Sequence, residues 1–138
     1  MLTNEENDFL TRVGPGTPCG QLLRRYWHPV GVVTELTETK PKKKLRILGE
    51  DLVLFRLPKT QGQIQYGLLA EHCSHRAASL YYGNVEENGL RCAYHGWKYD
   101  VSGRCLEQPF ESKEPPTKDE IRHPAYPDTI CGVVYQGT

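Results

Sequence analysis

The chain has 138 residues, a length that fits one domain with a buried core and leaves little room for a second catalytic lobe. Its 17 basic and 17 acidic residues balance, which argues against a nucleic-acid binder and against a polybasic membrane binder. The five cysteines form no disulfide framework, and no apolar stretch has the length of a signal core or a membrane span. We therefore expect a cytoplasmic protein whose partners are proteins or small molecules.

Short helical segments are expected near the N-terminus. Thr3 or Asn4 precedes a run with acidic residues in its first turn, which predicts a short helix that ends near Gly14. A joint rich in proline and glycine follows. Residues 21–27 (QLLRRYW) then predict another helical turn before Pro29.

From Lys44 onward the pattern changes to strands and turns. Residues 44–48 (KLRIL) and 52–58 (LVLFRLP) predict a hairpin about the turn at residues 49–51. Further strands are expected in four later segments, of which the third turns back at Ser102–Gly103: residues 63–71, 89–94, 97–107 and 131–136. A surface loop rich in proline and charge is expected over residues 108–128. The fold is therefore expected to be mostly β, with a helical lead-in over residues 1–43 and a sheet domain over residues 44–138.

Two short Cys/His clusters carry the candidate chemistry. One residue separates Cys73 from His75, and two separate Cys92 from His95. On tight turns, such spacings deliver two ligands from each loop to one centre. A structural zinc site usually groups its cysteines and histidines in separate clusters, or uses cysteine throughout. A 2Fe-2S centre of the Rieske type takes two cysteines on one iron and two histidines on the other, so one of each per cluster favours it, and zinc stays open as an alternative.

Other candidate ligands are weaker. His72 adjoins Cys73, but strand alternation places the two side chains on opposite faces. His28 and His123 have no carboxylate or histidine partner at ligand spacing. The remaining cysteines are scattered and are expected to be free thiols or packing residues: Cys19, Cys105 and Cys131. No catalytic residue is expected in the chain.

The segments CSHRAASLYYGN and RCAYHGWKYDVSGRC resemble the Rieske domain of ring-hydroxylating oxygenase alpha subunits. The segment NDFLTRVGPGTPCGQLLRRYWHPV is similar to the N-terminus of the phthalate dioxygenase branch, so the resemblance covers nearly the entire chain. It implies a Rieske-type antiparallel β-sandwich with a small cluster-binding subdomain, whose two loops lie within residues 71–100. It further implies that Cys73 and Cys92 bind the inner iron and that His75 and His95 bind the outer one.

The ligand set determines the charge of such a cluster. Two ferric ions, two sulfides, two thiolates and two neutral imidazoles sum to zero, so an electron is added more easily than to a four-thiolate cluster. Rieske centres span roughly −150 to +300 mV, against about −400 mV for plant-type ferredoxins. High-potential members have a hydroxyl donor directly after His-Gly and a disulfide between the loops. This chain has Trp97 in place of the hydroxyl donor, and Ala78 and Tyr94 in place of the two disulfide cysteines. We therefore expect a potential at the low end of the Rieske range, with Tyr99 as a candidate donor to a cysteine sulfur.

The resemblance also implies a role. The chain is expected to relay single electrons from a flavin-containing, NADH-dependent reductase to a mononuclear Fe(II) centre that hydroxylates or demethylates an aromatic compound. That iron binds two histidines and a carboxylate, and His123 is the only histidine after the second cluster, so the catalytic domain is expected outside this chain. The chain is then a fragment of a longer subunit that forms homotrimers, and it is not catalytic by itself. A stand-alone Rieske ferredoxin and a structural zinc-binding interaction domain are the alternatives.

Overall fold

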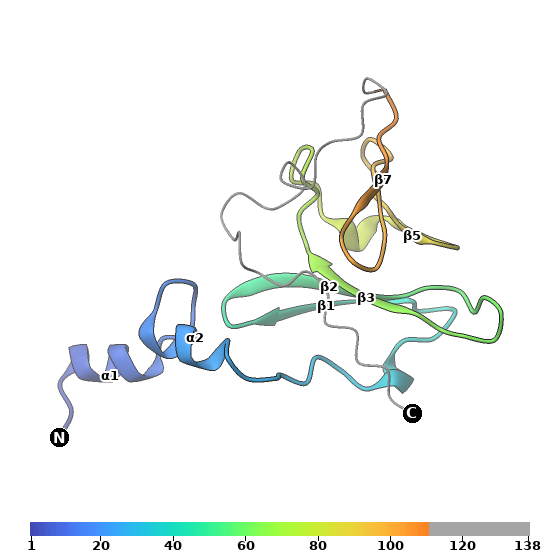
Figure 1. Ribbon diagram of the computed structural model, residues 1–138. Helices are drawn as coiled ribbons and strands as arrows, with labels where there is room; N and C mark the ends of the chain where they lie inside the picture. Colours follow the sequence, from blue (N-terminus) through green and yellow to red (C-terminus); the bar gives the residue numbers. More distant parts are fainter. Residues whose placement is uncertain (111–138) are drawn as a thin grey trace.

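The structure, a computed structural model, describes residues 1–110, and its N-terminal part is helical (Figure 1). Helix α1 spans Asn4–Thr11 and helix α2 spans Pro18–Leu23. Thr3 and Glu6 form a capping box on α1, in which the Glu6 carboxylate accepts from the Thr3 amide at 2.8 Å. The first predicted helix is confirmed. The second begins earlier than expected, because Thr17 supplies its N-terminal cap.

A three-stranded antiparallel sheet follows, in the order β1-β2-β3. Its strands are β1 (Lys42–Ile47), β2 (Glu50–Arg56) and β3 (Tyr66–Ala70). The predicted hairpin is confirmed, but its turn lies one residue earlier than expected, at Leu48–Gly49, where φ is 50° and 81°. Two successive positive φ values are typical of the type I′ turn, whose twist matches that of the flanking strands.

A second antiparallel sheet has the order β4-β5-β6-β7 and lies above the first in Figure 1. Its strands are β4 (Asn84–Glu86), β5 (Gly89–Arg91), β6 (Lys98–Tyr99) and β7 (Cys105–Glu107). Two short 3-10 helices complete the described elements: η1 (Val33–Glu35) and η2 (Leu80–Tyr82). The β6–β7 hairpin confirms the turn expected at Ser102–Gly103. Strand β4 was not expected, because three residues are too few to show an alternating pattern.

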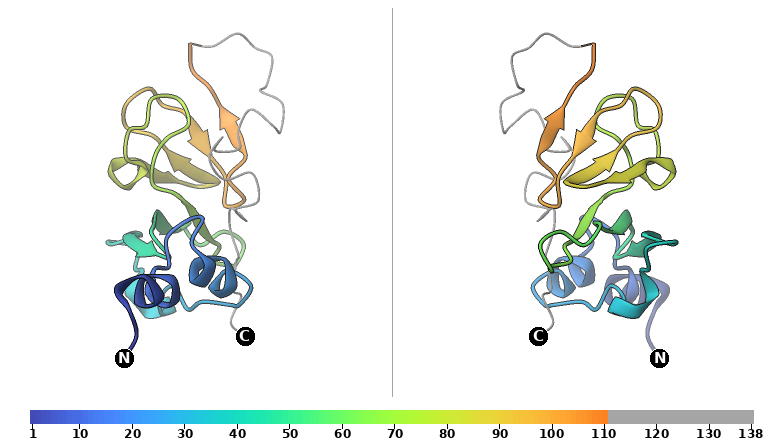
Figure 2. Two further views of the ribbon diagram at one scale, coloured as in Figure 1. Left: turned by 90° about the vertical axis from the view of Figure 1, so that its left-hand side faces the viewer. Right: turned by 90° about the vertical axis from the view of Figure 1, so that its right-hand side faces the viewer.

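One hydrophobic core joins the two sheets. Val53 and Phe55 of β2 and Leu90 of β5 are fully buried in it. Cys73 and Cys92 belong to the same core. The two views in Figure 2 show the four-stranded sheet at one end of the molecule and the helices and the three-stranded sheet at the other. Packing between the sheets therefore places the cysteines of both Cys/His clusters in one core.

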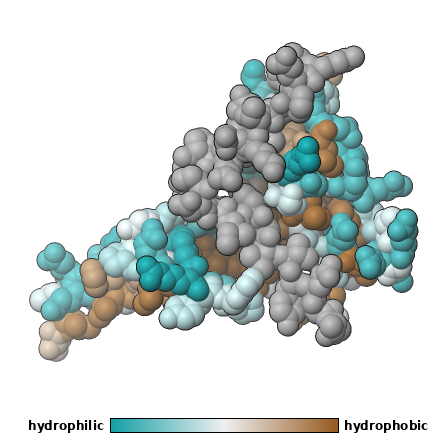
Figure 3. Space-filling view, viewed as in Figure 1, coloured by the Kyte–Doolittle hydropathy of each residue, from teal (hydrophilic) through white to brown (hydrophobic). Residues whose placement is uncertain are grey.

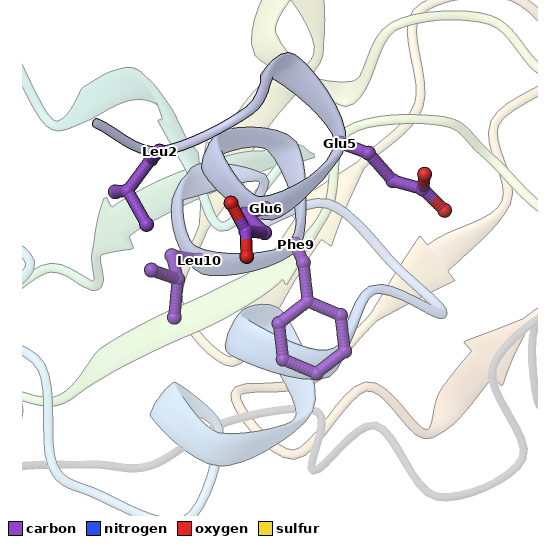
Figure 4. A pocket seen from close by; sticks show the side chains of 5 residues that line it. All are labelled: Leu2, Glu5, Glu6, Phe9 and Leu10. Atoms are coloured by element: carbon purple, nitrogen blue, oxygen red, sulfur yellow. The ribbon is translucent and has the colours of Figure 1, made fainter.

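The N-terminal helix stands apart from this core. Helix α1 has no buried residue, and its apolar side chains are exposed, as the brown atoms at the N-terminal end of Figure 3 show. A shallow hollow in this region is lined by the residues labelled in Figure 4: Leu2, Glu5, Glu6, Phe9 and Leu10. This hollow lies at the far end of the molecule from the four-stranded sheet.

The expected mostly β fold with antiparallel sheets and a short N-terminal helix is confirmed. Within residues 1–110, no helix is both long enough and apolar enough to cross a membrane. The strand expected over residues 131–136 lies outside the described residues, as does most of the loop expected over residues 108–128.

Candidate metal centre

Two loops carry the four predicted ligands. Loop 1, residues 73–78, follows β3 and precedes η2, and loop 2, residues 92–97, joins β5 to β6. Both loops lie beside the four-stranded sheet, in the upper half of Figure 1. The fold therefore brings together two clusters that are separated in the sequence by η2, β4 and β5.

The two loops share one backbone conformation. In each loop the cysteine amide donates to the carbonyl of the last residue, and the cysteine carbonyl accepts from the amide of the next-to-last residue. These distances are 2.9 and 2.8 Å in loop 1, and 2.8 and 3.1 Å in loop 2. The next-to-last residues, Ala77 and Gly96, have φ of 54° and 75°, so both loops turn back through the left-handed region. Two backbone hydrogen bonds thus hold each cysteine at the base of its turn.

The histidines occupy different places on these matched backbones. His75 is the third residue of loop 1, and His95 is the fourth residue of loop 2. Their rings nevertheless meet, with centroids 4.6 Å apart and planes at 67°. Cys73 and Cys92 are 4% and 3% exposed, whereas both histidines are half-buried. The predicted ligands therefore form an inner thiol pair and an outer imidazole pair.

The two thiols lie close enough to affect one another. Burial raises the pKa of the Cys73 thiol, and the neighbouring Cys92 raises it further. The Tyr99 hydroxyl acts in the opposite direction, since its oxygen lies 3.2 Å from Cys73 Sγ. Burial and the contact with Cys73 raise the pKa of Tyr99, so the phenol stays protonated and can donate to the sulfur. The geometry therefore agrees with the donor role expected for Tyr99.

Aromatic rings from loop 2 cover both imidazoles. Trp97 stacks on His75, with centroids 4.8 Å apart and planes at 3°. Tyr94 lies against His95, with centroids 3.8 Å apart and planes at 47°. The buried Nε1 of Trp97 makes no hydrogen bond to the described part of the chain, so the indole acts on His75 through its face. The stack between Trp97 and His75 links the two loops directly.

The environment of His95 favours the form that binds metals. Burial lowers the pKa of His95, and the nearby His75 and Arg76 lower it further. A lowered pKa keeps the imidazole neutral, and only the neutral ring has a lone pair for a metal ion.

A buried carboxylate fixes loop 1 to the three-stranded sheet. Glu71 is 6% exposed, and its Oε1 accepts from Ser79 Oγ at 2.6 Å and pairs with Lys44 Nζ at 2.6 Å. The hydrogen bonds from Lys44 and Ser79 lower the pKa of the Glu71 carboxyl. The sequence does not predict this contact, because Lys44 comes from β1 and becomes a neighbour only when the sheets have formed.

The donor set fits a 2Fe-2S centre of the Rieske type. Such a centre takes two thiolates on one iron and two imidazoles on the other, and the loops offer two neighbouring thiols and two neighbouring imidazoles. Among residues 1–110, no three Cys, His, Asp or Glu side chains are grouped as the ligands of a single ion would be. A binuclear centre needs only two protein donors at each iron, so this arrangement does not conflict with it.

The weaker candidates have other surroundings. His72 is exposed, and His28 Nε2 lies 2.8 Å from a backbone carbonyl oxygen. Cys19 and Cys105 are free thiols, and Cys105 packs against the core. Two further candidates lie outside the described residues: His123 and Cys131.

Comparison with known proteins gives consistent matches. A sequence profile of the Rieske [2Fe-2S] domain matches residues 26–127. The 5,5'-dehydrodivanillate O-demethylase oxygenase subunit of Sphingobium sp. (strain NBRC 103272 / SYK-6) is 53% identical over 135 residues, which cover 96% of this chain and 31% of that protein. The phthalate 4,5-dioxygenase oxygenase subunit of Pseudomonas putida is 44% identical over 127 residues, covering 91% of this chain and 28% of that protein. The chain therefore spans about a third of the length of these relatives.

Solved structures match the fold as well. NdmA of Pseudomonas putida CBB5 superimposes with a TM-score of 0.58 and 35% identity, covering 71% of this chain and 29% of that chain. Dicamba monooxygenase bound to dicamba gives a TM-score of 0.58 and 31% identity, covering 68% of this chain and 28% of that chain. Both alignments cover more than two thirds of this chain but less than a third of the solved structure.

Proposed function

This chain belongs to the Rieske [2Fe-2S] domain family, and on that premise we propose that four residues hold its cluster: Cys73, His75, Cys92 and His95. The thiolates of the inner pair bind one iron, and the imidazoles of the outer pair bind the other. One observation carries this assignment: two buried thiols and two half-buried imidazoles lie on two loops with the same backbone turn.

When bound, a 2Fe-2S cluster accepts and releases one electron at a time. The residues around it determine how readily this happens. The neutral imidazoles add no negative charge, whereas the thiolates are shielded from water by the core. The Tyr99 hydroxyl points a donor at Cys73 Sγ, and a hydrogen bond to sulfur stabilises the more negative reduced form. Because the histidines are less buried than the cysteines, electrons enter and leave on the imidazole side.

We place this domain in a longer oxygenase subunit, because its relatives are named as oxygenase subunits and are about three times its length. Residues 1–43 form the lead-in, and residues 44–138 form the cluster domain. In the cytoplasm, a flavin-containing, NADH-dependent reductase supplies the electrons, and a mononuclear Fe(II) centre elsewhere in the subunit receives them. The full-length subunit forms a homotrimer and oxidises an aromatic compound, the class to which phthalate and dehydrodivanillate belong.

A reductive titration tests this function. The purified protein should be brown, should bleach on reduction and should take up about one electron per chain, with a midpoint in the lower part of the range from roughly −150 to +300 mV. His72→Ala is the matched control, since this exposed histidine adjoins a ligand and should leave colour and midpoint unchanged. A colourless protein that takes up no electron would contradict the proposal.

A further inference from the structure

Four charged side chains, one from each strand of the four-stranded sheet, form a connected set of ion pairs. We call this set the loop 2 clamp: Glu86 of β4, Arg91 of β5, Lys98 of β6 and Glu107 of β7. Its two cations directly flank loop 2, Arg91 before it and Lys98 after it. The clamp contains two positive and two negative groups, so it adds no net charge beside the cluster site.

Arg91 makes most of the contacts in the clamp. Its Nε and Nη2 donate to the two carboxylate oxygens of Glu86 at 2.6 and 3.0 Å, and Nη2 also donates to Glu107 at 2.7 Å. Lys98 Nζ lies 2.8 Å from Glu86 and 3.4 Å from Glu107, and its side chain is only 7% exposed. The cations lower the pKa of Glu86 to about 2, so the quartet is fully charged at neutral pH.

The remaining guanidinium nitrogen of Arg91, Nη1, points into loop 2. Arg91 Nη1 donates to the carbonyl oxygen of Gly96 at 2.8 Å. Gly96 directly follows His95, and its own amide donates to the Cys92 carbonyl at 3.1 Å. Gly96, at which loop 2 turns back, is therefore held at its amide by the loop backbone and at its carbonyl oxygen by the Arg91 side chain. A guanidinium is planar with donors in fixed directions, so the carboxylates that fix two of its edges also fix the donor aimed at Gly96.

We propose that Arg91 is a positioning residue for His95. Glu86 and Glu107 orient its guanidinium, and the guanidinium holds the Gly96 carbonyl and thereby the neighbouring histidine at the outer iron. This role rests on the proposed function, since it takes His95 as a ligand. A lysine at position 91 keeps the charge, but its single ammonium group cannot reach two carboxylates and a carbonyl in the same fixed directions.

Two variants separate position from charge. Arg91→Lys keeps the charge of the clamp, and the double variant Arg91→Gln/Glu86→Gln keeps its neutrality, while both remove the fork that reaches Gly96. Arg46→Lys is the matched control, because Arg46 forms an exposed ion pair with Asp51 at 3.5 Å on the other sheet. The measurements are iron per chain, the electron paramagnetic resonance spectrum of the reduced protein, and the rate at which a ferrous chelator removes iron.

If Arg91 positions His95, both clamp variants release iron about tenfold faster than the parent, the change expected from one lost charge-assisted hydrogen bond. Their reduced spectra also shift, and Arg46→Lys matches the parent. Parent-like spectra and release rates in both clamp variants overturn the proposal. If the clamp variants bind no iron, far-UV circular dichroism decides: a parent-like spectrum supports positioning, and a lost spectrum shows that Arg91 only holds the sheet together. If the parent protein itself contained no iron, that result would contradict the proposed function on which this role rests.

Discussion

Loops 1 and 2 have the same backbone turn, but they are fixed to the molecule in different ways. Loop 1 is tied to the three-stranded sheet through Glu71 and Lys44, so its position relative to loop 2 depends on how the two sheets pack. Loop 2 is tied within its own sheet through Arg91, so its position depends mainly on the four-stranded sheet. A cluster that bridges the loops is therefore sensitive to the packing between the sheets on one side and to local strand pairing on the other.

The loops also differ in what they contribute around the ligands. Loop 2 supplies both aromatic covers, Trp97 on His75 and Tyr94 on His95. The strand that follows loop 2 supplies Tyr99, which contacts the sulfur of Cys73 in loop 1. Substitutions in and after loop 2 should therefore affect both halves of the site.

The largest effect should come from removing an inner ligand. Cys92→Ala deletes an anionic ligand from a buried position, and we expect cluster-free protein with a less stable fold, because metal-binding energy contributes to folding. Iron analysis and thermal unfolding measure both effects. His72→Ala, next to the other cysteine ligand, is the control and should keep its iron. Loss of the cluster in the control alongside its retention in Cys92→Ala would overturn the ligand assignment.

The turn residues provide a direct comparison of the two loops. Gly96→Ala should lower the free energy of unfolding by about 1–2 kcal/mol, the cost of the left-handed conformation for a residue with a Cβ. The new Cβ would also lie 3.3 Å from Pro109 Cγ. Ala77→Gly should change stability by less than about 1 kcal/mol, since relief of the positive φ is offset by greater freedom of the unfolded chain. Denaturant unfolding of both variants checks this, and the reverse order would show that the loops do not share a turn.

Tyr99→Phe tests whether the contact between the Tyr99 hydroxyl and Cys73 Sγ tunes the potential of the cluster. It removes the hydroxyl that lies 3.2 Å from Cys73 Sγ and leaves the ring in the core. The midpoint potential should fall by tens of millivolts, since about 1 kcal/mol of lost preference for the reduced form corresponds to roughly 40 mV for one electron. Tyr66→Phe on β3 serves as a control for the loss of a strand tyrosine hydroxyl. An unchanged midpoint in fully loaded Tyr99→Phe would show that the contact does not tune the cluster.

The smallest effect should be the pH dependence of the clamp. The pKa of Glu86 is lowered from 4.5 to about 2 by Arg91 and Lys98, so its ion pairs stabilise the fold above pH 4.5 and lose that contribution as the pH falls toward 2. Glu86→Gln should therefore be slightly less stable than the parent at pH 7 and should approach it at low pH. The difference should stay below about 1 kcal/mol, because the Glu86 side chain is 35% exposed and solvent screens its ion pairs. Thermal unfolding across this pH range measures it, and a gap that widens in acid would contradict the ion-pair assignment.

Local patterns predicted much of this molecule. The hairpin of β1 and β2 shows β-branched and large apolar residues between turn formers, and helix α1 carries its cap and acidic first turn within a few residues. The four candidate ligands are predictable because their spacing within each cluster is short. The clamp around Arg91 is not predictable from local patterns, because its partners come from strands that become neighbours only when β4 pairs with β5 and β7 pairs with β6. The same holds for the stack of Trp97 on His75, since it joins two loops that are distant in the sequence.

Metal and sulfide analysis of freshly purified protein tests the central claim most directly. If loops 1 and 2 hold a Rieske-type cluster, the protein contains about two irons and two acid-labile sulfides per chain, with zinc well below one equivalent. Stoichiometric zinc in colourless protein without sulfide would contradict that claim and would make the two loops a structural zinc site instead.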